Sequence, residues 1–295
     1  MISKDLLARV RKIEIRTRRM VDEITAGAYH SVFKGSGIEF DEVREYTSDE
    51  DVKDIDWNVT ARMGHPYVKK YVEERELTVM LLVDASASGH FGSGDKTKNE
   101  VVAEIASLLA FSAIRNHDKV GLLLFTDKTE LYLPPKSGRH HGLRLIRELV
   151  AREPEGRGTD ISGALENIVK ILHKKAVIFL ISDLIDDHGS YKKLLTLANK
   201  RHDIIAVRVL DPKELEFPKI PGLSLVDAEN NSFGYFSGGK KAATKYSENA
   251  KKLHQENKEI CRKAKVDLID IRSDEDLIKP LMTFFRQREK LDRRA

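Results

Sequence analysis

Short apolar runs alternate with longer amphipathic segments along residues 77–285. Uninterrupted apolar runs are typical of strands buried on both faces, and apolar steps of three and four residues are typical of helices. The predicted strands are 77–84, 119–126, 130–134, 176–183, 203–211 and 266–271. The predicted helices are 97–116, 141–151, 160–173, 190–201, a long helix ending near Lys265, and a helix with Ser273 as its N-cap. This alternation predicts an α/β fold with a doubly wound, mainly parallel sheet and helices on both faces.

Three further segments lie outside this alternation. Residues 4–24 predict an amphipathic helix whose second face is basic. Residues 34–59 are rich in acidic and turn-forming residues, which predicts a loop-rich segment with short strands. Residues 222–237 predict an antiparallel hairpin that turns at Asn230-Asn231. The expected organisation is an N-terminal helix and loop-rich segment at 1–76, an α/β domain at 77–286 and a basic tail at 287–295.

Charge and cysteine content narrow the function classes. The 295 residues carry 51 basic and 47 acidic side chains, and this net charge of +4 is too balanced to indicate nucleic-acid binding. The first helix and the tail are basic but lack the interleaved aromatics that stack on bases, so we favour a solvated helix face, with peripheral membrane contact as an alternative.

The single cysteine, Cys261, excludes an internal disulfide and a cysteine-rich zinc site. No apolar run approaches the ~20 residues of a membrane span, and a cytoplasmic protein is expected.

Polar side chains follow two of the predicted strands, at the point where each strand ends. Asp84, Ser86 and Ser88 come directly after the first strand, and Asp183 ends the strand 176–183. Thr159 lies in a loop just before a predicted helix. Ligands of open α/β sheets bind beyond the carboxyl ends of the strands, so we expect these groups to converge. An oxygen-only set suits Mg²⁺ or Mn²⁺ rather than zinc, and neutral hydroxyl ligands leave the metal ready to accept an external carboxylate. The alternative is that the serines only cap the next helix.

The order of these residues resembles the von Willebrand factor A (vWA) domain and its metal-ion-dependent adhesion site (MIDAS). The matching pattern is Asp-x-Ser-x-Ser, a loop threonine and a later strand-end aspartate. The resemblance covers residues 77–285 and implies that Asp84, Ser86, Ser88, Thr159 and Asp183 hold the metal. A departure is the longer glycine-rich loop 89–98, which could shape access to the metal or let His90 or Asp95 approach it. For His90, an exposed loop histidine is the favoured interpretation.

The segment before the first strand resembles the family known as domain of unknown function 58. The similarity rests on Gly37-Ile38-Glu39-Phe40, Val43-Arg44-Glu45-Tyr46, Ile55-Asp56-Trp57, Ala61-Arg62 and the pair Glu73 and Glu74. The resemblance implies association with a MoxR-type AAA+ ATPase, with this chain as adaptor or co-chaperone for a client protein. Arg44, Asp56, Trp57 and Arg62 are candidates for the partner contact. The alternative is that Trp57 is a core residue that packs against the α/β domain and that Arg44 or Arg62 pairs with nearby acids.

Two functions from different classes follow from the sequence. The expected one is Mg²⁺-dependent binding of a partner carboxylate, without catalysis. The alternative is a metal-dependent hydrolase acting on phosphate esters. No second metal set, nucleophile elbow or phosphate-binding loop accompanies the motif, and only Asp160 and His90 are near enough in sequence to act as a base. Binding is therefore favoured over hydrolysis.

Overall fold

The computed structural model describes residues 10–15, 17, 20–21, 37–47, 51–74, 76–186, 191–216, 223–226, 232–236 and 239–292. The chain divides into two compact units. One unit is Phe33–Leu77, and the other combines Met1–Val32 with Thr78–Ala295. Across the part of the chain that the structure describes, no helix is both long and apolar enough to cross a membrane.

The larger unit is built on a six-stranded sheet of order β10-β7-β6-β3-β4-β5. Its strands are β3 (Thr78–Asp84), β4 (Lys119–Phe125), β5 (Thr129–Lys136), β6 (Val177–Ser182), β7 (Asp203–Leu210) and β10 (Asp267–Arg272). All neighbours pair in parallel except β5, which is antiparallel to β4 at one edge. The strand β3 comes first in sequence among these six strands and lies between β4 and β6, so the order of the strands reverses at β3. The doubly wound, mainly parallel fold predicted from the sequence is confirmed.

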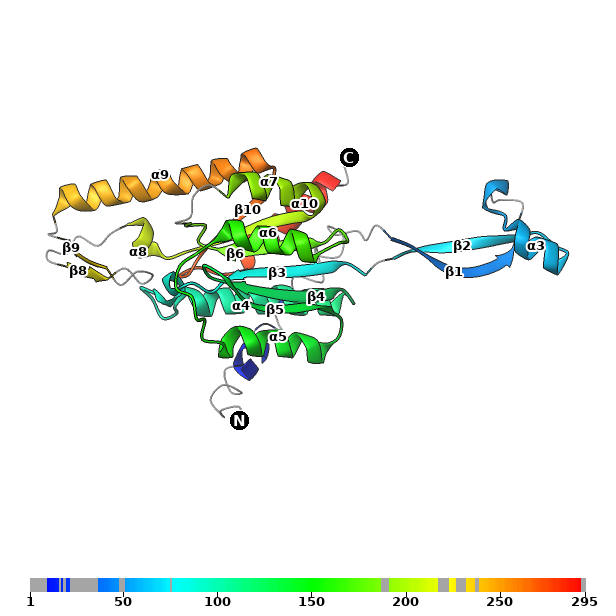
Figure 1. Cartoon of the computed structure of the whole chain (residues 1–295), viewed down its shortest axis with the longest axis horizontal. Coiled ribbons are helices and arrows are strands. Elements are labelled where there is room, and N and C mark those ends of the chain that lie inside the picture. The colour runs from blue at the N-terminus through cyan, green and yellow to red at the C-terminus, as the bar shows by residue number, and fades with distance from the viewer. Residues whose placement is uncertain are drawn as a thin grey trace. The chain divides into compact units, whose positions relative to one another are not determined.

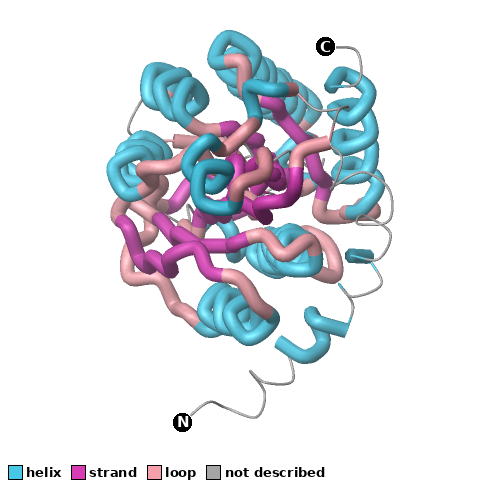
Figure 2. The backbone as a smooth tube through the Cα atoms, turned by 90° about the vertical axis from the view of Figure 1, so that its right-hand side faces the viewer, coloured by secondary structure: helices cyan, strands magenta, loops and turns pink. Residues whose placement is uncertain are grey.

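Helices cover both faces of this sheet, as Figures 1 and 2 show. The helices of the unit are α4 (Lys98–Arg115), α5 (Arg139–Ala151), α6 (Ile161–Ile171), α7 (Lys192–Arg201), α8 (Pro212–Leu215), α9 (Lys240–Ala264) and α10 (Ile278–Asp292). Helices α6, α7 and the end of α9 share one hydrophobic core with the sheet. Helices α4 and α5 pack together on the opposite side, and α10 packs on β10.

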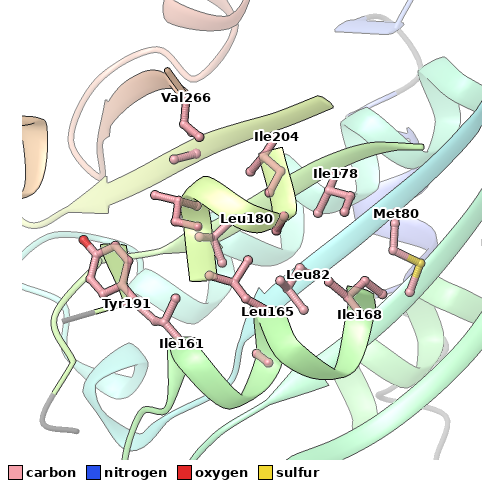
Figure 3. Packing of buried hydrophobic residues seen from close by; sticks show 14 of the residues in the cluster. Met80, Leu82, Ile161, Leu165, Ile168, Ile178, Leu180, Tyr191, Ile204 and Val266 are labelled. Atoms are coloured by element: carbon pink, nitrogen blue, oxygen red, sulfur yellow. The ribbon is translucent and has the colours of Figure 1, made fainter. Parts of the chain in front are cut away.

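The core explains why the central strands β3, β4, β6 and β7 are nearly unbroken apolar runs. Met80 and Leu82 point from β3 toward Leu165 and Ile168 of α6, as Figure 3 shows. The intervening residues of β3 are buried as well, because the other face of the strand is covered by α4. Cys261 is buried in the same core and its pKa is raised to about 11 by that burial, which makes it a packing residue.

The smaller unit contains a two-stranded antiparallel sheet of β1 (Gly37–Glu45) and β2 (Tyr67–Glu74). The segment that connects the two strands contains the helix α3 (Trp57–Met63), which is capped at its N-terminus by Asp56. The sequence predicted short strands in a loop-rich segment, whereas β1 has 9 residues and β2 has 8. The charged and turn-forming residues obscured the strand pattern, because neither strand carries a long apolar run.

Other predictions have mixed outcomes. Residues 10–15, 17 and 20–21 are helical, and the rest of the predicted helix 4–24 lies outside the described residues. The hairpin is present as β8 (Leu223–Val226) paired with β9 (Phe233–Phe236), and its predicted turn at Asn230-Asn231 lies outside them. The prediction that Ser273 caps the last helix is wrong. Helix α10 begins at Ile278, whose N–H binds Asp276, while the Ser273 hydroxyl donates to Asp211. Helix α10 runs to Asp292, so most of the predicted basic tail is helical.

Candidate functional site

The carboxyl ends of β3 and β6 meet at one edge of the sheet. The two strands pair in parallel with Val83 opposite Ile181, which brings the residues that follow into register. Asp84 ends β3, and Ser182 and Asp183 end the neighbouring strand or follow it directly. The pairing of two central strands therefore places both predicted carboxylates at the switch point of the sheet.

Asp84 is fixed by two hydrogen bonds. Its Oδ1 accepts the N–H of Ser86 at 2.9 Å, and its Oδ2 accepts the hydroxyl of Ser182 at 2.7 Å. Burial first, and the negative charge of Asp183 second, raise the pKa of Asp84 to about 6. The carboxylate of Asp84 is therefore buried beside a second carboxylate, a setting that disfavours its ionised form.

The two serines form a chain of hydroxyls that leads to Asp183. Ser86 Oγ lies 3.0 Å from Ser88 Oγ, and Ser88 Oγ donates to Asp183 Oδ2 at 3.1 Å. Ser86 is the N-cap of a 3-10 helix but makes no side-chain capping bond. For Ser86, the alternative of a helix-capping side chain is therefore wrong, because its hydroxyl contacts Ser88 instead of the helix backbone.

Thr159 is buried in a loop that is tied to the same edge. The carbonyl of Arg157 accepts the N–H of Ala87 at 2.9 Å, and the N–H of Asp160 donates to the Thr126 carbonyl at 3.0 Å. Thr159 itself is 1% exposed but does not line the cavity described below. Asp160 caps α6 by accepting the N–H of Gly163 at 2.8 Å, which gives it a structural role.

Lys98 is a component of the site that the sequence analysis missed. Its Nζ lies 2.9 Å from Asp183 Oδ2 and 2.6 Å from Glu214 Oε1. Although burial acts in the opposite direction, the two carboxylates raise the pKa of Lys98, so the side chain is an ammonium. The spacing in the sequence indicates that Lys98 lies on the buried face of the helix. Lys98 precedes the buried Val102 and Ile105 by four and seven residues, which places all three on one helix face.

The middle of the glycine-rich loop 89–98 is anchored to Asp211, which is not one of the metal-binding candidates. Ser93 donates to Asp211 through both its N–H, at 2.9 Å, and its hydroxyl, at 2.6 Å. His90 and Asp95, which the sequence brought into consideration, are exposed. The loop thus brings Lys98, rather than the histidine or the aspartate, to the carboxylates.

The backbone after Asp183 is in a rare conformation. Leu184 has a φ of 61° although it is a bulky residue that disfavours this region. Its carbonyl accepts the amide of Asn257 at 2.8 Å, and its N–H donates to the Ser182 hydroxyl at 3.0 Å. Such backbone strain is concentrated at functional sites, where the surrounding contacts maintain it.

The polar side chains at the ends of β3 and β6, together with Lys98, line a small cavity of about 20 Å³. Its lining includes both carboxylates, both serines, Ser182 and Lys98; the remaining residues are Gly89, Asn99, Val102 and Val209. A volume of about 10–15 Å³ accommodates one water, so the cavity is of the size of a single small ligand atom or ion.

The sequence matches the family described as "Protein of unknown function DUF58" over residues 42–257. The chain belongs to this family. The uncharacterized protein Rv1480 of Mycobacterium tuberculosis is 26% identical over 287 residues, which are 97% of this chain and 90% of the relative. The resemblance to this family that the sequence predicted is thereby confirmed.

Two solved structures are similar at low identity. BatB from Bacteroides thetaiotaomicron matches with a TM-score of 0.45 and 15% identity, over 72% of this chain and 99% of that chain. A von Willebrand factor type A protein from Catenulispora acidiphila matches with a TM-score of 0.38 and 11% identity, over 76% of this chain and 44% of that chain.

The donor set of this DUF58 chain fits a hard divalent cation. Within the described residues, no group of three or more His, Cys, Asp or Glu side chains is placed to hold a metal ion. The site instead combines carboxylates with serine hydroxyls, which are ligands that Mg²⁺ and Mn²⁺ accept. Asp84, Asp183 and Glu214 oppose the one ammonium of Lys98, so these four groups leave two negative charges when all are ionised. A divalent cation would balance that charge and favour the ionised form of Asp84, whose pKa is raised by burial first and by Asp183 second.

The predicted partner-contact residues belong to the smaller unit. Asp56 is buried and accepts the N–H of Asn58 at 3.0 Å and that of Val59 at 3.4 Å, so it is a helix cap. Trp57 is 65% exposed, so the structure does not place it in a core. Arg44 and Arg62 are exposed as well. Val52 and Met63 are two further exposed apolar side chains of this unit that the sequence analysis did not select.

Proposed function

We propose that this DUF58 protein is a binding adaptor whose Mg²⁺ site captures a carboxylate of a partner protein. The observation that carries the proposal is the Ser86–Ser88–Asp183 hydroxyl chain beside the buried Asp84. These groups are held by the ends of two central strands, which makes the site rigid enough to select an ion and its ligand.

Asp84, Ser86, Ser88, Asp183 and the nearby Thr159 are the residues that would hold the metal. When bound, the metal supplies a Lewis acid with a coordination position for an oxygen of the partner. Ser86 and Ser88 offer neutral oxygens, and the hydrogen bonds of Asp84 to Ser86 and Ser182 fix the carboxylate in place. A binding role fits this chain better than hydrolysis, because His90 is exposed and Asp160 is engaged as a helix cap.

The partner class is part of the proposal. The resemblance to vWA domains suggests protein interaction, and the family resemblance suggests a MoxR-type AAA+ ATPase that remodels a client protein. The exposed Trp57 supports a second contact through the smaller unit, because exposed aromatic side chains are frequent anchors of protein interfaces. This second contact would not depend on the metal.

The test is purification of the tagged full chain from its native host in Mg²⁺ and in EDTA, followed by identification of the retained proteins. The expected result is a MoxR-type AAA+ ATPase that is retained in Mg²⁺ and lost in EDTA. Asp84→Asn in Mg²⁺ should behave like the wild type in EDTA, whereas a variant of an exposed aspartate in the loop 89–98, Asp95→Asn, should behave like the wild type in both buffers.

Two other outcomes separate the alternatives. Retention of the ATPase in both buffers, with loss in Trp57→Ala, would move the contact to the smaller unit and overturn the metal-dependent role. Absence of any ATPase, together with hydrolysis of a phosphate ester by the purified protein, would replace the adaptor proposal with the hydrolase.

A further inference from the structure

Lys98 brings a fixed positive charge to one of the carboxylates of the candidate metal site. Its side chain is 3% exposed, and its Nζ contacts Asp183 Oδ2 at 2.9 Å. The same oxygen accepts the Ser88 hydroxyl at 3.1 Å. A carboxylate oxygen has two lone pairs, so these two donors use the whole acceptor capacity of Asp183 Oδ2. A metal that binds this oxygen must displace one of them.

The other oxygen of Asp183 is only partly used. Asp183 Oδ1 accepts the N–H of Ile185 at 3.1 Å and keeps one lone pair. A divalent cation at Oδ1 would still lie close to the ammonium on Oδ2, because the two oxygens belong to one carboxylate. Two positive charges at such separation repel each other strongly where water is excluded. Metal and ammonium therefore oppose each other at either oxygen.

Glu214 gives the ammonium a second carboxylate that it can keep. Glu214 Oε1 lies 2.6 Å from Lys98 Nζ, and its Oε2 accepts the N–H of Asp211 at 3.1 Å within the capping box of α8. The position of Glu214 is thus fixed by the backbone and not by Lys98 alone. An ammonium that leaves Asp183 remains paired, which avoids the large cost of an unpaired buried charge.

We propose that Lys98 is an internal cation that competes with the divalent metal for Asp183, with Glu214 retaining the ammonium when the metal enters. The inference rests on the proposed function, since it concerns the same metal site. It adds a regulatory property to that site. The ammonium of Lys98 neutralises part of the negative charge in the absence of metal, and the cost of moving Lys98 lowers the affinity for the metal.

The test is calorimetric titration of the full-length, metal-free protein with MnCl₂ and MgCl₂. Lys98→Met should bind Mn²⁺ at least about tenfold more tightly than the wild type, because the competing charge is removed. Lys96→Met is the matched control. Lys96 lies two residues away and pairs with Glu104 at 2.7 Å, so the same loss of charge there should change the dissociation constant by less than about twofold.

A double variant distinguishes competition between Lys98 and the metal for Asp183 from an effect of the net local charge alone. Lys98→Met with Glu214→Gln removes one positive and one negative charge, so the local charge equals that of the wild type. Competition predicts that the double variant still binds Mn²⁺ more tightly than the wild type, whereas a pure charge effect predicts the wild-type affinity and overturns the inference. Circular dichroism in EDTA checks folding, and Lys98→Gln, which removes the charge but keeps a donor, replaces Lys98→Met if that variant is unfolded.

The outcomes also distinguish this inference from the proposed function. Metal binding by the wild type with unchanged affinity in Lys98→Met overturns the inference and leaves the adaptor proposal standing. Binding by Lys98→Met alone supports the inference and overturns a metal-dependent role for the wild type. Absence of binding by both proteins overturns both ideas.

Discussion

The hydroxyl of Ser182 donates to Asp84 Oδ2 at 2.7 Å and joins two residues that are 98 positions apart. This bond connects the ends of β6 and β3 directly beneath the candidate metal site. It also opposes the rise in the pKa of Asp84 that burial and Asp183 produce. Much of what can be tested about the site follows from the energetic balance around this carboxylate.

Asp84→Asn should separate folding from metal binding. Because folding raises the pKa of Asp84 to about 6, the ionised group opposes folding of the metal-free protein at pH 7. In EDTA the variant should therefore melt at the wild-type temperature or above it. Mg²⁺ at about 100 times its dissociation constant should stabilise the wild type by about 2.7 kcal/mol and the variant by much less. Thermal melts with and without Mg²⁺ measure both effects, and equal stabilisation of the two proteins would contradict the assignment of Asp84.

Ser182→Ala should destabilise the protein through Asp84. Removal of the hydroxyl leaves a buried carboxylate oxygen without its donor, which costs about 1–3 kcal/mol in the free energy of unfolding. Urea denaturation measures this loss. In an Asp84→Asn background the same substitution should cost less, because no charge is left unsatisfied. If the loss is equal in both backgrounds, Ser182 acts through some contact other than Asp84.

His202 should make stability dependent on pH. Both ring nitrogens are buried without a hydrogen-bond partner, and burial, followed by the charge of Arg201, lowers the pKa of the ring. The unfolded chain then takes up a proton first as the pH falls below about 6.5. The contribution of His202 to the free energy of unfolding is therefore fully present above about pH 6.5. It is lost as the pH falls through the lower pKa that His202 has in the folded protein.

His202→Leu should accordingly flatten the dependence of unfolding free energy on pH between about 7 and 5. Urea titrations at several pH values give the slope for each protein. The exposed His140 provides the control, since His140→Asn should leave the slope unchanged. A wild-type slope in His202→Leu would show that other groups govern acid sensitivity.

Asn257 should matter for metal affinity although it lies outside the metal-binding set. Its amide holds the carbonyl of Leu184, the residue with φ of 61° that follows Asp183. Asn257→Leu should cost about 1–3 kcal/mol in stability and weaken Mn²⁺ binding, since the strained backbone can relax and move Asp183. Tyr191→Phe is the comparison. It removes only the 3.2 Å bond from Tyr191 to Asn257 and should have the smaller effect on both calorimetry and urea denaturation.

The sequence was most informative where burial is continuous. The central strands β3, β4, β6 and β7 are nearly unbroken apolar runs, and the position of Asp84 at a strand end followed from that pattern alone. The same argument failed for contacts between distant segments. Ser273 has the side chain of an N-cap, yet its hydroxyl donates to Asp211 at 3.2 Å, and Asp276 binds the start of α10 instead. A tertiary partner prevailed over a local capping signal.

Lys98 illustrates a second limit. A lysine near the start of a helix is ordinarily a solvated residue, and only its alignment with Val102 and Ile105 on the buried face indicated otherwise. Its carboxylate partners, Asp183 and Glu214, are 85 and 116 positions away. Which of the acidic residues would meet it depends on the order of the strands in the sheet, which the strand pattern does not specify.

The place of β3 between β4 and β6 has a consequence for the synthesis of the protein. Ser182 is synthesised 98 positions after Asp84, so β3 is made well before its neighbour β6. During that interval β3 is an apolar segment with one side unpaired, which makes the nascent chain prone to misassociation. The cavity between Asp84 and Asp183 comes into existence only when β6 has joined the sheet. Occupation of the cavity would therefore require synthesis at least as far as Val209 and the pairing of β6 with β3.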